Sequence, residues 1–103
     1  MSAATFAVLA DPSRLRILDL LRERPRPVGE LVGALGISQP GVSRHLRVLR
    51  DARLVTARPD AQRRIYEVRA EPLSEIDAWL APYRALFADH LDALERHLDE
   101  SKE

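Results

Sequence analysis

Residues 38–50, SQPGVSRHLRVLR, separate onto two opposite sides when successive residues are placed 100° apart, as in an α-helix. One side is apolar and consists of Val42, Leu46, Val48 and Leu49. The other side is polar and consists of Gln39, Pro40, Ser43, Arg47 and Arg50, with Arg44 at its edge. Ser38 is a suitable N-cap, and a proline is tolerated in the first turn. Such a helix needs a core on one side and leaves hydrogen-bonding groups free on the other.

Three further helices are predicted before this segment. A short one covers residues 5–9, and a second begins after Asp11, a good N-cap that is followed by a proline. The two prolines of the RPRP segment stop the second helix. A third helix begins near Val28 and ends at Gly36, which is a suitable C-cap.

A hairpin and a long helix are predicted after the segment. LVTAR (54–58) and RIYEV (64–68) have the pattern of two strands, joined by a polar, basic tip at 59–63. A helical pattern then runs from 72 to 100, and Pro82 predicts that this helix kinks or restarts near Leu80.

This order of elements predicts a mainly α fold with a small β-hairpin, the winged helix-turn-helix. We expect a single domain over residues 1–103. Within it, the helix-turn-helix occupies 28–51, the wing 54–68, and a C-terminal dimerisation helix 72–100.

Positive charge is concentrated in the first 70 residues. These hold 13 Arg and 7 acidic residues, whereas residues 71–103 hold 3 basic and 9 acidic residues. Residues 44–69 alone contain 8 Arg and 3 acidic residues. A basic surface on a helix-turn-helix and its wing favours double-stranded DNA as the partner.

A DNA-reading helix presents its first turns to base edges in the major groove. Gln pairs with adenine and Arg with guanine, each contact contributing about 1–3 kcal/mol of discrimination, while Ser suits phosphate oxygens. The predicted DNA-binding residues are Ser38, Gln39, Pro40, Ser43, Arg44 and Arg47, with Arg58, Arg63 and Arg64 on or beside the hairpin tip. His45 lies on the apolar side, which favours a partly buried histidine. Tyr66 is expected to pack under the hairpin.

Three stretches together resemble a known family. LADPSRLRILDLL, ELVGALGISQPGVSRHLRVLRDARLV and QRRIYEV are similar to the ArsR-type winged-helix transcriptional repressors of bacteria. The resemblance implies a homodimer that binds an inverted repeat in the operator of its own operon and is released by a ligand or metal ion. It also places Ser38, Gln39, Ser43, Arg44, His45 and Arg47 in the DNA-reading helix and Arg63 and Arg64 in the wing. His45 is therefore a candidate DNA contact as well.

The sequence departs from the resembling family at two informative places. Members that sense soft metals carry a cysteine pair in the third helix, where this chain has Val32 and Ala34 and no cysteine at all. Arg53 occupies a position where glycine often ends the reading helix, so a left-handed backbone there would cost about 1 kcal/mol. No cofactor is expected, and the sequence does not identify a small-molecule inducer.

The apolar stripe of the last helix is wider than packing on a small domain requires. We expect a homodimer through the first and last helices, as in the resembling family. The predicted interface consists of Phe6, Leu9, Leu73, Ile76, Trp79, Leu80, Tyr83, Phe87, Leu91, Leu94 and Leu98.

Some relatives bind zinc between their last helices through Asp and His. The candidates in this chain are Asp89, His90, His97 and Glu100. In those relatives an Asp-x-His pair is followed much later by His-x-x-His or His-x-x-Glu. This chain has only the last part of that spacing, in His97 and Glu100, because Leu86, eleven positions before His97, cannot be a ligand. Packed interface histidines are therefore favoured over a metal site, and pH sensing is the remaining alternative.

Other classes of function fit less well. There is no cysteine, glycine-rich phosphate loop or nucleophile elbow, and the three His occupy two separate helices, which argues against an enzyme. No apolar run suits a membrane helix and no signal peptide is evident, so the expected location is the cytoplasm. The alternative function is a winged-helix protein–protein interaction module without DNA binding. That module would need an apolar or acidic recognition surface, which Gln39, Ser43, Arg44 and Arg47 do not supply.

Overall fold

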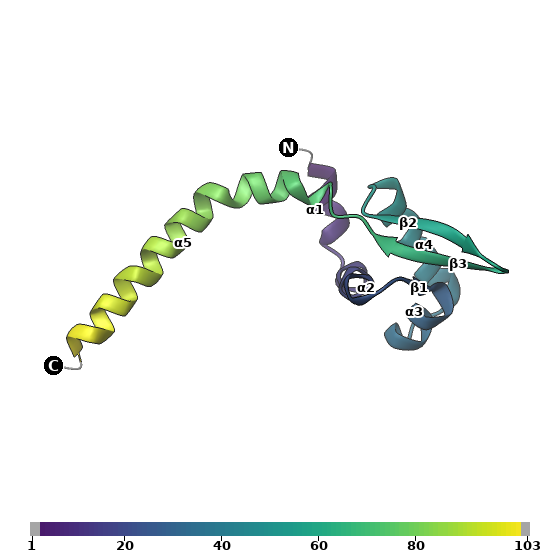
Figure 1. Cartoon of the computed structure of the whole chain (residues 1–103), viewed down its shortest axis with the longest axis horizontal. Coiled ribbons are helices and arrows are strands. Elements are labelled where there is room, and N and C mark those ends of the chain that lie inside the picture. The colour runs from purple at the N-terminus through teal and green to yellow at the C-terminus, as the bar shows by residue number, and fades with distance from the viewer. Residues whose placement is uncertain (1–2, 102–103) are drawn as a thin grey trace. The chain divides into compact units, whose positions relative to one another are not determined.

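The computed structural model describes residues 3–101 and divides into two compact units, residues 3–73 and residues 74–101. The elements labelled in Figure 1 are α1 (Ala3–Leu9), α2 (Pro12–Glu23), β1 (Arg26–Pro27), α3 (Val28–Leu35), α4 (Gln39–Asp51), β2 (Val55–Asp60), β3 (Arg63–Val68) and α5 (Leu73–Ser101). This order confirms the predicted winged helix-turn-helix. None of the helices within 3–101 has the length and apolarity needed to span a bilayer. The expectation of one domain over residues 1–103 stays a prediction.

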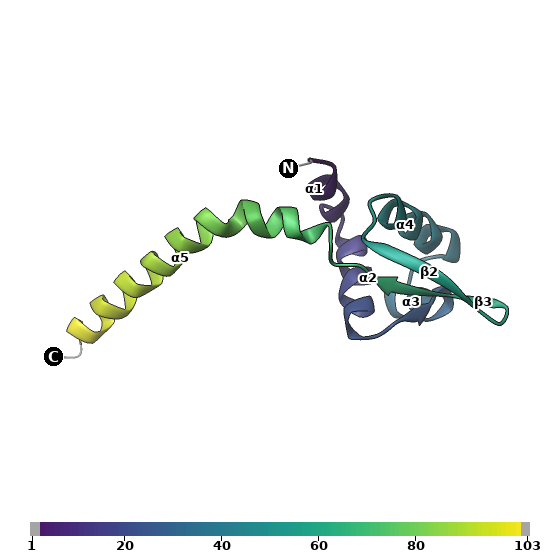
Figure 2. The ribbon, with the colours of Figure 1, turned by 45° about the horizontal axis from the view of Figure 1, so that its top comes forward.

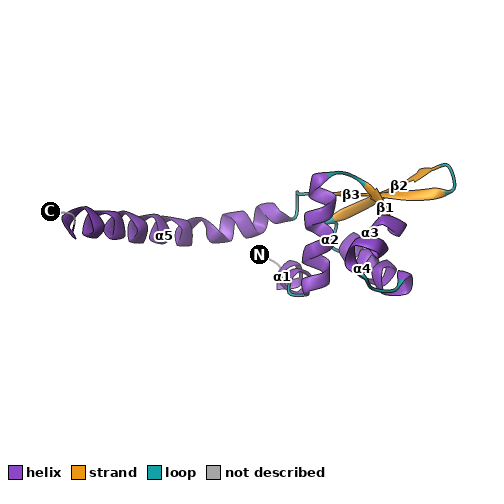
Figure 3. Cartoon of the chain, turned by 90° about the horizontal axis from the view of Figure 1, so that it is seen from below, coloured by secondary structure: helices purple, strands orange, loops and turns teal. Residues whose placement is uncertain are grey.

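The core of the first unit lies between the helices and one face of the sheet, and α3 and α4 are seen on the same side of the strands in Figure 3. Each of α2, α3 and α4 contacts the sheet. The buried cluster consists of Ile17, Leu21, Leu31, Leu35, Val42, Leu46, Leu49, Leu54, Val55 and Tyr66. Three residues of the apolar side predicted for 38–50 therefore lie in the core, Val42, Leu46 and Leu49, whereas Val48 is half-buried outside the cluster. The tip of the hairpin extends beyond the helices (Figure 2).

The start of α2 is capped as the sequence predicts. Asp11 Oδ1 accepts the N–H groups of Ser13 at 2.8 Å and Arg14 at 3.2 Å. The Arg14 N–H is the largest cause of the lowered pKa of Asp11, and the Ser13 N–H and the charges of His45 and Arg14 act in the same direction. The Arg14 side chain also closes the preceding helix, because its Nε donates to the carbonyl of Val8 at 2.6 Å.

Replacement of Asp11 by Ala should lower the free energy of unfolding at pH 7, because the side chain that accepts the N–H groups of Ser13 and Arg14 is removed. Because the folded pKa lies below the unfolded value, the ionised cap stabilises the protein above about pH 4 and loses its effect as the pH falls through the folded pKa. Urea unfolding from pH 7 to pH 3 should therefore show the two proteins converging. Asp19→Ala, at an exposed position of the same helix, should change stability by less than about 0.5 kcal/mol.

Helix α4 ends in a Schellman motif. The N–H of Leu54 donates to the carbonyl of Leu49 at 2.9 Å, and the N–H of Arg53 donates to that of Arg50 at 2.9 Å. Leu49 and Leu54 are both buried, which supplies the apolar contact of the motif. Arg53 has a φ of 63°, so the backbone at this position is left-handed and the cost considered for a non-glycine residue applies.

Arg53→Gly should raise the free energy of unfolding by about 0.5–1 kcal/mol, because glycine adopts this backbone without steric cost. Arg50→Gly, within the same helix, should lower it by about 1 kcal/mol, because glycine is a poor helix former. Thermal unfolding of the two variants beside the wild type distinguishes these opposite shifts. A loss of stability in Arg53→Gly would contradict a strained conformation at this position.

The sheet has three strands in the order β1-β3-β2, one more strand than the sequence predicts. Arg26 pairs with Tyr66 and Pro27 with Ile65. Two residues that include a proline have no alternating pattern, so nothing in the sequence marks them as a strand. The Arg26 side chain fixes this strand, since it donates to the carbonyl of Leu20 at 3.0 Å and pairs with Glu23 at 2.7 Å.

The hairpin tip is shorter than predicted. Asp60 pairs with Arg63 in the ladder, which leaves only Ala61 and Gln62 in the connection instead of residues 59–63. Ala61 has a φ of 57°, and two-residue connections need such a positive φ. An ion pair of 3.4 Å between Arg63 and Asp60 closes the end of the ladder.

A kink or a restart was expected near Leu80; helix α5 is continuous through Pro82, so the restart is wrong, and the kink stays a prediction. Figure 1 shows a single helix that curves along its length. The Arg84 side chain spans the proline: Nη1 donates to Asp77 Oδ1 at 2.6 Å and Nη2 to the Asp77 carbonyl at 3.2 Å. This side chain holds together the turns on either side of the residue that lacks an N–H.

Candidate nucleic-acid interface

The exposed side of α4 carries the side chains that the sequence assigned to DNA reading. Ser38 caps the helix as predicted, because its Oγ accepts the N–H of Gly41 at 3.2 Å. A Cβ at Gly41 would lie 3.2 Å from that oxygen, so the glycine leaves room for the cap. The exposed members of the predicted set in and before this helix are Ser38, Gln39, Pro40, Ser43, Arg44 and Arg47.

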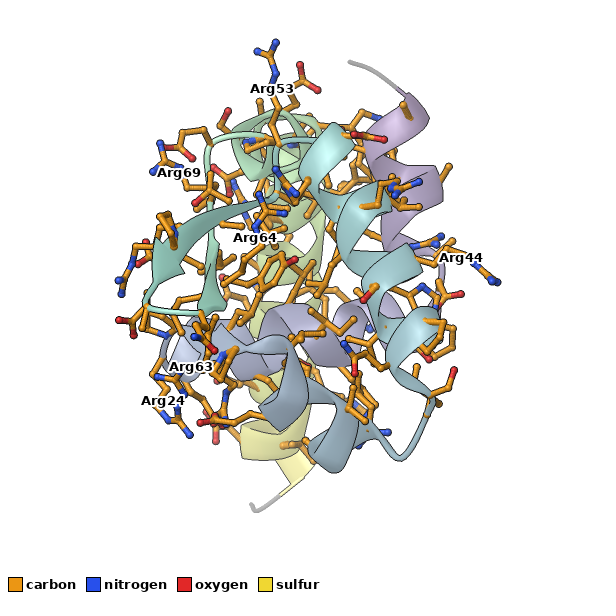
Figure 4. The ribbon with its side chains drawn as sticks, turned by 90° about the vertical axis from the view of Figure 1, so that its right-hand side faces the viewer. Arg24, Arg44, Arg53, Arg63, Arg64 and Arg69 are labelled. Atoms are coloured by element: carbon orange, nitrogen blue, oxygen red, sulfur yellow. The ribbon has the colours of Figure 1, made fainter. Side chains whose placement is uncertain are left out.

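The wing arginines are exposed but differ in their partners. Arg58 Nε is 2.7 Å from Glu67 Oε1, and Arg63 pairs with Asp60 at the tip. Within the described chain, no acidic group lies within ion-pair distance of Arg64, Arg44 or Arg47. Figure 4 shows Arg44 on the side of α4 turned away from the hairpin, and Arg63 and Arg64 on the hairpin side. Unpaired guanidinium groups carry the full positive charge that a phosphate would meet.

A groove of about 530 Å³ lies between the reading helix and the wing. Its lining residues come from β1, α3, α4 and the hairpin: Pro27, Val28, Gly29, Gln39, Ser43, Gln62, Arg63, Arg64 and Tyr66. Tyr66 belongs to the core as predicted, yet it also reaches this groove. The sequence contains no signal for the groove, because β1 and the start of α3 complete it.

His45 differs from the other predicted contacts in α4. The residue is half-buried, and its Nδ1 is buried with no hydrogen-bond partner among residues 3–101. Its charge contributes to lowering the pKa of Asp11, so the imidazole lies near the start of α2. This position agrees with the side of the helix on which the sequence pattern placed it.

The apolar residues of α5 are largely exposed in the single chain. Exposed fractions range from 37% to 65% for Trp79, Leu80, Tyr83, Leu86, Phe87, Leu91, Leu94 and Leu98. Phe6 is exposed as well, whereas Leu9 and Leu73 are half-buried against the core of their own unit, and Ile76 is half-buried. Trp79 and Tyr83 stack one turn apart, with ring centroids 4.8 Å from each other.

The residues present do not fit a metal site of the thiolate type. The chain has no cysteine. Val32, which stands where soft-metal sensors of the resembling family carry one of their two cysteines, packs against the core. Among the side chains that the structure describes, no group of three or more His, Asp or Glu could hold a metal ion. Asp89, His90, His97 and Glu100 thus form no such group within the described chain.

Comparison with known proteins places the chain in a group of regulators. Residues 11–57 match the family model described as bacterial regulatory protein, arsR family. The chain is 43% identical over 77 residues to the uncharacterized HTH-type transcriptional regulator Rv0081 of Mycobacterium tuberculosis, covering 74% of this chain and 68% of the relative. It is 29% identical over 75 residues to the transcriptional repressor SdpR of Bacillus subtilis, covering 73% of this chain and 83% of that protein.

The fold has a solved counterpart. The solution structure of the homodimeric winged helix-turn-helix DNA-binding domain Mb0332 of Mycobacterium bovis aligns with a TM-score of 0.64 at 30% identity, covering 86% of this chain and 80% of that one. Fold and exposed basic helix together define a winged helix-turn-helix protein of the kind that regulates transcription. The chain belongs to the ArsR family of bacterial regulatory proteins.

Proposed function

We propose that the protein is a homodimeric, sequence-specific repressor that binds an inverted-repeat operator and is released by a ligand not yet identified. The observation that carries this proposal is the exposed polar side of α4, which is backed by the buried Val42, Leu46 and Leu49. Docking on the core fixes the helix, so its free side chains can meet base edges in a defined register.

The two sets of basic residues have different roles in this proposal. Gln39 and Arg47 read base edges from α4, while Ser38, Ser43 and Arg44 contact the phosphate backbone. On the wing, Arg64 meets phosphate directly. Arg58 and Arg63 exchange their carboxylate partners, Glu67 and Asp60, for phosphate oxygens.

The dimer is proposed to form through α5 together with α1. The exposed apolar side chains of α5 form a surface large enough to be typical of a protein–protein interface. The homodimeric state named for Mb0332, a structure of the same fold, supports this assignment. Two copies would present two reading helices to half-sites one DNA turn apart, about 34–36 Å.

Fluorescence anisotropy on the DNA immediately upstream of the gene tests the proposal, with a scrambled duplex and a salt series alongside. We expect two chains per site and a preference of at least about a thousandfold over the scrambled duplex. Equal, salt-sensitive binding to both duplexes would leave a DNA-binding protein whose operator lies elsewhere. Absence of binding at low salt would contradict the proposal and favour the protein–protein interaction module.

A further inference from the structure

Tyr66 combines a buried ring with an unused hydroxyl group. Only 8% of the residue is exposed, and its ring belongs to the core cluster. The hydroxyl makes no hydrogen bond within the described chain, and it is not one of the fully buried polar atoms there, so it is open to the groove between α4 and the wing that the residue lines. The buried ring fixes the position of this hydroxyl, which is free to donate a hydrogen bond to a group bound in the groove.

The start of α3 faces the same groove with unused donors. Pro27 is the N-cap and provides no side-chain hydrogen bond, so the first N–H groups of the helix lack a side-chain acceptor. Gly29, in the first turn, lines the groove, and a Cβ at this position would meet nothing within 4 Å. The groove is therefore open at the point where backbone N–H groups and the positive end of the helix dipole are available.

Charge completes this arrangement. Arg64 lines the groove without an acidic partner in the described chain, and Ser43 of α4 lies on the opposite wall. The groove thus offers a phenol hydroxyl, a guanidinium, an alcohol and backbone N–H groups, all of which can donate hydrogen bonds. No carboxylate lines it.

Resting on the proposed DNA-binding function, we propose that this groove is a phosphate-binding subsite in which Tyr66 Oη, Arg64 and the N–H of Gly29 hold one phosphate group. A backbone phosphate of bound DNA is the source that the position favours, because the groove separates the reading helix from the wing. Tyr66 is then a DNA-contacting residue that fixes the register of α4 without reading a base.

The variant Tyr66→Phe tests the proposal, because it removes only the hydroxyl. Anisotropy on a mixed-sequence 30-bp duplex at low salt should show affinity reduced on the order of tenfold, with an unchanged melting temperature. Arg64→Gln should weaken binding and also reduce the salt slope by about 0.9, since one phosphate contact is lost. Tyr66→Phe should leave that slope unchanged, because the hydroxyl carries no charge.

A pair of glycine variants separates occupation of the groove from changes in the helix. Gly29→Leu fills the groove and should weaken DNA binding at least as much as Tyr66→Phe. Gly33→Leu, in the same helix and equally free of neighbours within 4 Å, lies outside the groove and should bind as the wild type does. Equal effects of the two variants would contradict the proposal.

Two measurements identify the source of the phosphate. Inorganic phosphate titrated into the ¹⁵N-labelled protein at constant ionic strength should shift the Gly29 amide resonance only weakly. A strong shift, together with full DNA affinity in Tyr66→Phe, would assign the groove to a free phosphorylated ligand and overturn the DNA assignment. Wild-type DNA affinity in Tyr66→Phe without any phosphate shift would overturn the subsite altogether. Failure of the wild-type protein to bind DNA would instead contradict the proposed function.

Discussion

A single aspartate in place of Leu94 should convert the protein from dimer to monomer and reduce operator affinity by at least about a hundredfold. Leu94 lies in the middle of the exposed apolar stripe of α5, so a charge there would have to be buried without a partner on dimerisation. A monomer would also lose the second half-site, which the dimer engages at a high effective concentration. Sedimentation equilibrium and anisotropy on the operator measure the two losses.

Ala85→Asp is the matched control for this prediction. Residue 85 lies nine positions before Leu94, which places it on the opposite side of the helix at about 100° per residue. The same charge on the exposed polar side should leave both the dimer and DNA binding intact. Circular dichroism should show unchanged helix content in both variants, because neither position is buried in the single chain. A Leu94→Asp protein that remains dimeric would exclude this stripe as the interface.

Arg47→Ala should relax base preference more than it weakens binding. Arg47 is exposed in the second half of α4 with no acidic partner in the described chain, so its guanidinium is free to pair with a guanine edge. Loss of one such pair removes about 1–3 kcal/mol of discrimination at a single base pair. Anisotropy on an operator series, in which each base pair is replaced in turn, should show one position becoming tolerant.

Arg50→Ala is the comparison for Arg47→Ala. Arg50 is exposed one turn further along the same helix, where a contact with the DNA backbone is expected at most. It should retain the full pattern of base preference, and any loss should be equal for all sequences. Unchanged preference in Arg47→Ala would remove this residue from the reading set.

The helix boundaries could be predicted because their signals are local. Asp11, Ser38 and Gly36 each act on backbone groups within four residues, and each takes the predicted role at a helix end. The separation of α4 into two sides is equally local, because a helix of known pitch fixes it. The left-handed backbone of Arg53 is also a local feature, because it accompanies the two hydrogen bonds that close the end of α4.

The features missing from the prediction depend on contacts between distant residues. β1 exists because Arg26 and Pro27 pair with Ile65 and Tyr66, almost forty positions away. The groove depends on that same pairing, which brings the start of α3 beside the wing. Pro82 is accommodated within α5, where Arg84 contacts Asp77 seven residues earlier on the same side of the helix, whereas the expectation of a restart considered the proline alone.

The shortest strand has a mechanical consequence. β1 is joined directly to the first residue of α3 and is held in the sheet by β3, so the hairpin and the helix-turn-helix are fastened to each other beside the start of α3. A force that lifts the wing from DNA would be transmitted through this link to α3 and then across the turn at Gly36 to the reading helix. We expect the wing and the reading helix to leave DNA in one step, so a dissociation intermediate with the wing alone detached would not accumulate.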